Sequence, residues 1–232
     1  MNSEKLNKNE SNHLELNESK GEYIPALKYN WLTKAYDFVL KYTMPEKAFK
    51  SKLVECADIS AKQNVLDFGC GTATLSLLTK EMNSEAYVVG VDVDEQALTI
   101  ARDKIEKSKA DIKLIKITPG NLDFEKNTFD RVISSLVFHH LTDSQKVESL
   151  KEILRVLRPK GTLTIVDWGK ASNLLMRLLF YLVQILDGFE TTTSNVKGRL
   201  PEFMKEGGFK EVGILKSYNT VYGTLSVYQA KR

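Results

Sequence analysis

Two glycines and two acids stand where two apolar stretches of the sequence end. The stretch VLDFGCGTAT, residues 65–74, interrupts its apolar run with Asp67 and then places Gly69 and Gly71 among small residues. Because glycine has no Cβ atom, such a segment turns tightly and lets a ligand touch the backbone. A second apolar stretch ends at Asp92, 23 residues after Gly69. A carboxylate at that point can accept both hydroxyls of a ribose.

Two common nucleotide motifs fit this pattern poorly. The dinucleotide fingerprint Gly-x-Gly-x-x-Gly has Thr74 at its third glycine, and the phosphate loop ending in Gly-Lys-Ser/Thr is absent. Asp92 would also repel a 2′-phosphate, which disfavours NADP. The alternative role for Asp92 is to cap the helix that begins near Asp94.

Strands and helices that alternate along the chain are expected to position these residues. Apolar runs and helical periodicity alternate from residue 64 to 168, and this predicts right-handed crossovers and a mostly parallel sheet. The expected strands are 64–68, 86–92, 111–117, 129–136 and 161–168, the last after a turn at 158–161. The expected helices are 72–83 (Leu75, Leu78 and Met82 on one stripe), 95–110 (Ala97, Ile100, Ala101 and Ile105 on one face) and 143–157.

The rest of the chain completes a doubly wound, Rossmann-like α/β fold. Two final β-rich runs predict a seven-stranded sheet, and a short helix ends at Gly207 and Gly208. Residues 1–22 are polar and predict a disordered tail. The domain organisation expected from these patterns is an N-terminal helical cap over 23–60, a catalytic domain over 61–232, and a helical insertion over 170–205 after the fifth strand.

Composition excludes several classes of protein. The 33 basic and 30 acidic residues give a net charge of +3, without a dense basic stripe, so nucleic-acid binding is not expected. The two cysteines, Cys56 and Cys70, are too few for a disulfide framework or a zinc site. Their expected state is the reduced thiol of a cytoplasmic protein. No metal site is expected.

Four motifs occur in the order found in a known family. VLDFGCGTA, VVGVDVDEQALTIAR, FDRVISSLVFHHL and LKEILRVLRPKGTLTIVD resemble the sequential motifs of class I S-adenosylmethionine-dependent methyltransferases. The resemblance covers about residues 30–168. Within that class the chain looks most like small-molecule enzymes, including the ubiquinone/menaquinone C-methyltransferase group. The segment YDFVLKYTMPEKAF is similar to the N-terminal cap of that group.

The resemblance implies a set of donor-binding residues for the co-substrate S-adenosylmethionine. Its amino-acid end would lie against Gly69 and Gly71, with Asp67 holding the ammonium through water and Asp92 holding the ribose. The family often has an aspartate for the adenine amino group after the third strand. Here that position is Thr118 without gaps or Asn121 after a short deletion, and the two remain open. Two further donor-binding candidates are Ser135, on the rim after the fourth strand, and Tyr36, in the cap.

The acceptor side has fewer signals. His139 and His140 follow the fourth strand, and a histidine there can act as a general base or pack the loop. His140 and Asp167, at the end of the fifth strand, are the catalytic candidates. Asp167 has a loop hydrogen bond as its alternative role, and core packing is the alternative for Tyr36.

The apolar segment 173–190 is too short to span a membrane. It covers the core, lines an apolar acceptor pocket, or lies against a membrane surface as a peripheral contact. The expected partner is a small apolar or aromatic acceptor, quinone- or lipid-like. A protein-modifying methyltransferase and a non-catalytic S-adenosylmethionine-binding domain are the rival functions. The oligomeric state has no signal in the sequence.

Overall fold

The computed structural model describes residues 46–170, 181, 184, 189–220 and 223–232. The expected tail, most of the expected cap and most of segment 173–190 lie outside these residues, as does Tyr36. The strands are β1 (Asn64–Phe68), β2 (Tyr87–Asp92), β3 (Ile112–Lys116), β4 (Phe129–Ser135), β5 (Leu157–Trp168), β6 (Lys210–Asn219) and β7 (Thr224–Lys231). The helices are α2 (Glu46–Ala57), α3 (Thr74–Met82), α4 (Glu95–Ser108), α5 (Asp143–Val156), α7 (Phe189–Val196) and α8 (Leu200–Glu206), with a 3-10 turn η1 (Phe138–His140).

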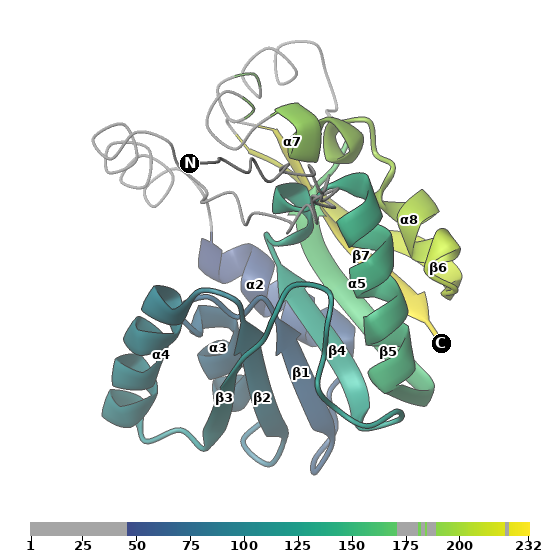
Figure 1. Ribbon diagram of the computed structural model, residues 1–232. Helices are drawn as coiled ribbons and strands as arrows, with labels where there is room; N and C mark the ends of the chain where they lie inside the picture. The colour runs from purple at the N-terminus through teal and green to yellow at the C-terminus, as the bar shows by residue number, and fades with distance from the viewer. Residues whose placement is uncertain (1–45, 171–180, 182–183, 185–188, 221–222) are drawn as a thin grey trace, which may run out of the picture.

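The seven strands form one sheet in the order β3-β2-β1-β4-β5-β7-β6 (Figure 1). Strands β1 to β5 run parallel to one another, and β7 runs antiparallel to both β5 and β6. The strand order reverses between β1 and β4, and ligands of such sheets bind beyond the carboxyl ends at this switch point. The predicted Rossmann-like, mostly parallel sheet of seven strands is confirmed.

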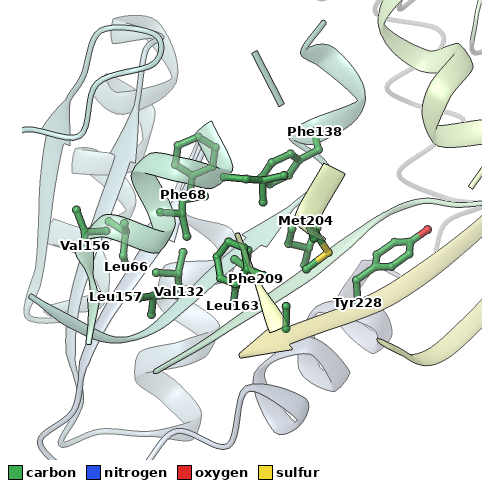
Figure 2. Packing of buried hydrophobic residues seen from close by; sticks show 14 of the residues in the cluster. Leu66, Phe68, Val132, Phe138, Val156, Leu157, Leu163, Met204, Phe209 and Tyr228 are labelled. Atoms are coloured by element: carbon green, nitrogen blue, oxygen red, sulfur yellow. The ribbon is translucent and has the colours of Figure 1, made fainter. Parts of the chain in front are cut away.

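Helices cover both faces of the sheet because successive strand residues point to opposite sides. Val65 packs in a cluster with residues of α2 and α3. Leu66, the next residue of β1, packs in a second cluster with residues of α5 and α8, part of which is drawn in Figure 2. Helix α2 belongs to the expected N-terminal cap, yet it packs directly on β4 and β5.

Local signals explain where the main crossover helices begin. The Asp94 carboxylate accepts hydrogen bonds from the backbone N–H groups of Gln96 and Ala97 at 2.8 and 3.4 Å, which caps α4. Thr142 and Gln145 form a reciprocal capping box at the start of α5. Both helices follow strands that end at the carboxyl edge, so their caps fix the loops of that edge.

Three sequence expectations differ from the structure. Strand β5 begins at Leu157, and the predicted turn at 158–161 is an irregularity inside it, with a register shift opposite Phe129 and Lys160 at φ +67°. Met82 and Ile100 are 41% and 49% exposed, so neither belongs to a buried stripe. In α4 the fully buried residues are Leu98 and Ala101.

Within the described ranges, no helix has both the length and the apolar character needed to cross a membrane.

Candidate active site

The glycine loop joins β1 to α3 beside the ends of β2 and β4. The N–H groups of Gly69 and Cys70 both donate to the carbonyl oxygen of Val91 at 2.9 Å. Gly69 has φ +71° and Gly71 has φ +52°, a region that side chains disfavour. A Cβ on Gly69 would also lie 2.3 Å from Cγ2 of Val137, in the loop after β4. Glycine at position 69 is therefore required by the backbone and by its close neighbour.

Asp92 is tied to the glycine loop. Its Oδ2 accepts a hydrogen bond from the N–H of Gly71 at 2.7 Å, and its Oδ1 accepts one from the N–H of Asp94 at 2.9 Å. The cap of α4 is Asp94, so the alternative role considered for Asp92 is filled by another residue. Each carboxylate oxygen can accept two hydrogen bonds, so Asp92 keeps acceptor capacity for hydroxyl groups of a ligand.

Asp67 is a buried acid with one oxygen engaged. The Ser76 hydroxyl donates to its Oδ2 at 2.5 Å, and its buried Oδ1 has no hydrogen-bond partner among the described residues. Burial raises the pKa of Asp67 to about 6, although the Ser76 hydrogen bond and the charge of Lys50 oppose that shift. An unpaired carboxylate oxygen in a dry site favours a cationic ligand group, since burial without a partner is costly.

Thr118 and Asn121 lie together after β3. They pair as an isolated antiparallel bridge, with the N–H of Asn121 donating to the carbonyl of Thr118 at 3.2 Å. Both line a hollow of about 360 Å³, along with Ile115, Ile117 and Phe124. Lys116 and Asp123 also line it, so three apolar residues and four polar or charged ones surround the hollow. Both candidates for the adenine contact, Thr118 and Asn121, therefore lie at the same hollow, and either one could make the contact.

Two adjacent serines end β4. The Ser134 hydroxyl donates to the carbonyl of Phe68 at 2.8 Å and so links β4 to the end of β1. The Ser135 hydroxyl is buried and has no partner among the described residues. Ser135 therefore offers an uncommitted hydroxyl at the switch point.

Asp167 holds the loop after β4. Its carboxylate accepts from the N–H groups of Phe138, His139 and Trp168 at 2.8, 3.3 and 2.7 Å, and lies 2.8 Å from Nδ1 of His139. Burial alone would raise the pKa of Asp167, but His139 and these donors outweigh it and leave the pKa below its usual value. The Asp167 side chain is fully buried. Its geometry matches the loop-bonding role that the sequence left open for it.

His139 is buried, whereas His140 is exposed on the same turn. Their ring centroids lie 3.9 Å apart. Although His140 keeps access to solvent, loss of hydration where its ring packs against the turn, and then the neighbouring His139, lower its pKa to about 3. His140 is therefore neutral near pH 7 but a weak base, because a general base works best when its pKa lies near the working pH.

Two polar residues of this region escaped sequence reasoning. Ser76 contacts Asp67, and its only sequence signal is a small polar residue beside the apolar stripe of α3. Asn195, in α7, donates from Nδ2 to Oδ1 of Asp167 at 3.4 Å and is fully buried. It lies in the polar run TTTSN, which carries no signal of burial. Both cysteines are free, and burial raises the pKa of the Cys70 thiol.

Comparison with known proteins identifies the family. Residues 65–161 match the methyltransferase domain family, and these residues contain the glycine loop, Asp92 and η1. The ubiquinone/menaquinone biosynthesis C-methyltransferase UbiE of Wigglesworthia glossinidia brevipalpis is 34% identical over 127 residues, which are 53% of this chain and 50% of that protein. The span of the chain over residues 65–161 is a methyltransferase domain.

Other relatives of this methyltransferase match more of its length. The demethylmenaquinone methyltransferase of Listeria monocytogenes (strain HCC23) is 27% identical over 225 residues, which are 85% of this chain and 91% of that protein. A methyltransferase structure from Aquifex aeolicus, with a TM-score of 0.59 and 21% identity, covers 82% of this chain and 91% of its own. The YcgJ protein of Bacillus subtilis has a TM-score of 0.66 at 14% identity, with 80% and 98% covered. Both structures support the fold.

Proposed function

We propose that this methyltransferase methylates a ring carbon of a small aromatic acceptor of the quinone type. The observation that carries the proposal is the match over 85% of the chain to a protein named demethylmenaquinone methyltransferase. Buried aromatic residues of the two core clusters pack below the carboxyl edge, where the acceptor is proposed to bind. The rings of Phe68 and Phe138 lie 5.8 Å apart (Figure 2), and Trp168 ends β5.

The donor residues in this proposal are those the resemblance implied. The free oxygen of Asp67 receives the ammonium group, the backbone at Gly69 and Gly71 lies against the amino-acid end, and Asp92 receives the ribose hydroxyls. Thr118 or Asn121 contacts the adenine amino group, and Ser135 offers its uncommitted hydroxyl. Tyr36, outside the described residues, is proposed to reach the donor carboxylate.

The reaction places few demands on side chains. When bound, S-adenosylmethionine supplies an electrophilic methyl group, so no protein nucleophile is required. The protein mainly orients the two substrates, an effect that can contribute about 7–11 kcal/mol. A ring carbon becomes nucleophilic when an adjacent hydroxyl is deprotonated, so the acceptor has to be the hydroquinone. His140, neutral near pH 7, is proposed to accept the hydroxyl proton, and Asp167 holds the turn that carries it. As the new C–C bond forms, the methyl–sulfur bond breaks and S-adenosylhomocysteine leaves; the ring carbon then loses its hydrogen as a proton to solvent, and His140 returns a proton to the ring oxygen.

Asp92→Asn is expected to weaken binding of S-adenosylhomocysteine about tenfold. Loss of charge-assisted hydrogen bonds to the ribose should cost about 1.5 kcal/mol. Calorimetry measures the affinity. Asp94→Asn is the matched control, because asparagine caps a helix as well as aspartate does, and it should bind like the wild type. Equal affinities of all three proteins would remove Asp92 from the donor site.

An anaerobic transfer assay tests the acceptor. The full chain is incubated with methyl-labelled S-adenosylmethionine and a prenylated 1,4-naphthohydroquinone that lacks the neighbouring ring methyl. Label is expected in the extracted naphthoquinone product and not when the oxidised quinone replaces the hydroquinone. Label in protein added to the same assay, with none in the quinone, would instead indicate a protein-modifying enzyme.

A further inference from the structure

Buried polar atoms without partners gather at the carboxyl edge of the sheet. Four buried side-chain atoms have no hydrogen-bond partner in the described part of the chain: Oδ1 of Asp67, Oγ of Ser135, Oγ1 of Thr162 and Oδ1 of Asn195. Thr162 pairs with Arg131 near the opposite end of the sheet. Asp67 and Ser135 lie at the carboxyl ends of β1 and β4, and Asn195, in α7, contacts the carboxyl end of β5 through Asp167 and Trp168. The proposed donor residues account for Asp67 and Ser135, which leaves Asn195 unexplained.

The amide of Asn195 is fixed in one orientation. Its Nδ2 donates to Oδ1 of Asp167 at 3.4 Å and to the carbonyl of Trp168 at 3.5 Å. Turning the amide over would set its oxygen against a carboxylate and a carbonyl, which are acceptors only. The oxygen is therefore the atom left free, and it can only accept a hydrogen bond.

The helix that carries Asn195 is anchored on both sides. Helix α7 contacts η1 and the end of β5 (Figure 1). Ser194 donates to Oδ1 of Asp143 at 2.5 Å, and the fully buried Lys146 donates to the carbonyl of Thr191 at 2.8 Å. Because these bonds hold α7 to α5, Asn195 cannot relieve its free oxygen by a small shift of the helix.

We propose that Oδ1 of Asn195 accepts a hydrogen bond from a hydroxyl group of the methyl acceptor. The inference rests on the proposed hydroquinone acceptor and names the residue that receives one of its hydroxyl groups. The N–H groups of Phe138, His139 and Trp168 already donate to Asp167, so they are not open to an acceptor that carries only carbonyl or ether oxygens. Asn195 thus selects the hydroxyl form of the acceptor over its methyl ether.

Binding of two matched probes tests this without turnover. The probes are 1-naphthol and 1-methoxynaphthalene, titrated into the full chain saturated with S-adenosylhomocysteine. The wild type is expected to bind 1-naphthol about tenfold more tightly. Asn195→Ala should reduce that preference to less than twofold while the affinity for S-adenosylhomocysteine stays unchanged. Thr162→Val is the control, since it removes an unpartnered hydroxyl far from the edge, and it should keep the full preference.

If the Asn195→Ala variant does not fold, a second measurement on the wild type tests the same hydrogen bond. In the wild type, the side-chain amide resonances of Asn195, assigned with Asn195→Ser, should shift with 1-naphthol and not with 1-methoxynaphthalene. A wild type that binds both probes equally or neither, or a preference that survives Asn195→Ala, overturns the inference. Because neither readout uses the transfer assay, a naphthol preference without quinone methylation would contradict the proposed function alone.

Discussion

Replacing Asp167 by alanine is expected to lower the melting temperature by about 6–20 °C. The carboxylate is fully buried and holds three backbone N–H groups and the His139 ring. Removing one partner of a buried, bonded ion costs about 3–5 kcal/mol, because the remaining groups are left unpaired. For a chain of this size, each kcal/mol shifts the melting temperature by about 2–4 °C. Calorimetric or spectroscopic melting at pH 7 measures the change.

An exposed acid provides the control for Asp167. Glu95 pairs with Arg102 at 2.7 Å on the surface of α4, where both side chains are about half exposed. Because exposed ion pairs contribute little, Glu95→Ala should melt close to the wild type. The lowered pKa of Asp167 adds a pH test, since its stabilisation is present above the unfolded pKa and is lost as pH falls. The difference between Asp167→Ala and the wild type should therefore shrink in acid; a small, pH-independent difference would contradict the role of Asp167.

The sequence predicted the sheet because local and long-range signals agree in this fold. Each parallel strand is a short apolar run, and each crossover helix has its own start signal, as Asp94 and Thr142 illustrate. Some expectations that rested on periodicity alone were wrong. Ile100 fits a helical stripe by spacing, but α4 packs on β2 and β3 at one side of the sheet and buries Leu98 instead. The strand irregularity near Lys160 depends on pairing with β4, which no local pattern encodes.

The candidate site also contains residues that the sequence alone identifies and residues that only the structure identifies. The positive φ angles at positions 69 and 71 favour glycine, so residue type and spacing alone identify these two positions in the sequence. Asn195 acts through contacts with residues 27 and 28 positions away, and such pairs leave no trace in a single sequence. The structure also separates two buried acids that look alike in the sequence. Asp167 has a lowered pKa and satisfied oxygens, whereas Asp67 has a raised pKa and a free oxygen.

Asp67→Asn is expected to weaken donor binding about a hundredfold while removing a pH-dependent cost to folding. The buried carboxylate has a pKa of about 6, roughly two units above its unfolded value. Below pH 4 both states are protonated, and between pH 4 and 6 the folded state holds more protons. The free energy of unfolding therefore falls by about 3 kcal/mol as pH rises through that window. Relative to the wild type, the variant should gain stability from pH 4 to 7.

Binding of S-adenosylhomocysteine should show the opposite dependence on pH. Its ammonium group stays charged below pH 7, so the affinity of the wild type should rise as Asp67 ionises near pH 6. The affinity of Asp67→Asn should stay flat over the same range. Ser76→Ala sharpens the test, because the Ser76 hydroxyl lowers the pKa of Asp67 and its loss should move both transitions to higher pH. Melting curves and calorimetry from pH 4 to 7.5 measure these effects. If neither variant changed the pH dependence, Asp67 would be ionised throughout and its free oxygen would not be the group that receives the ammonium.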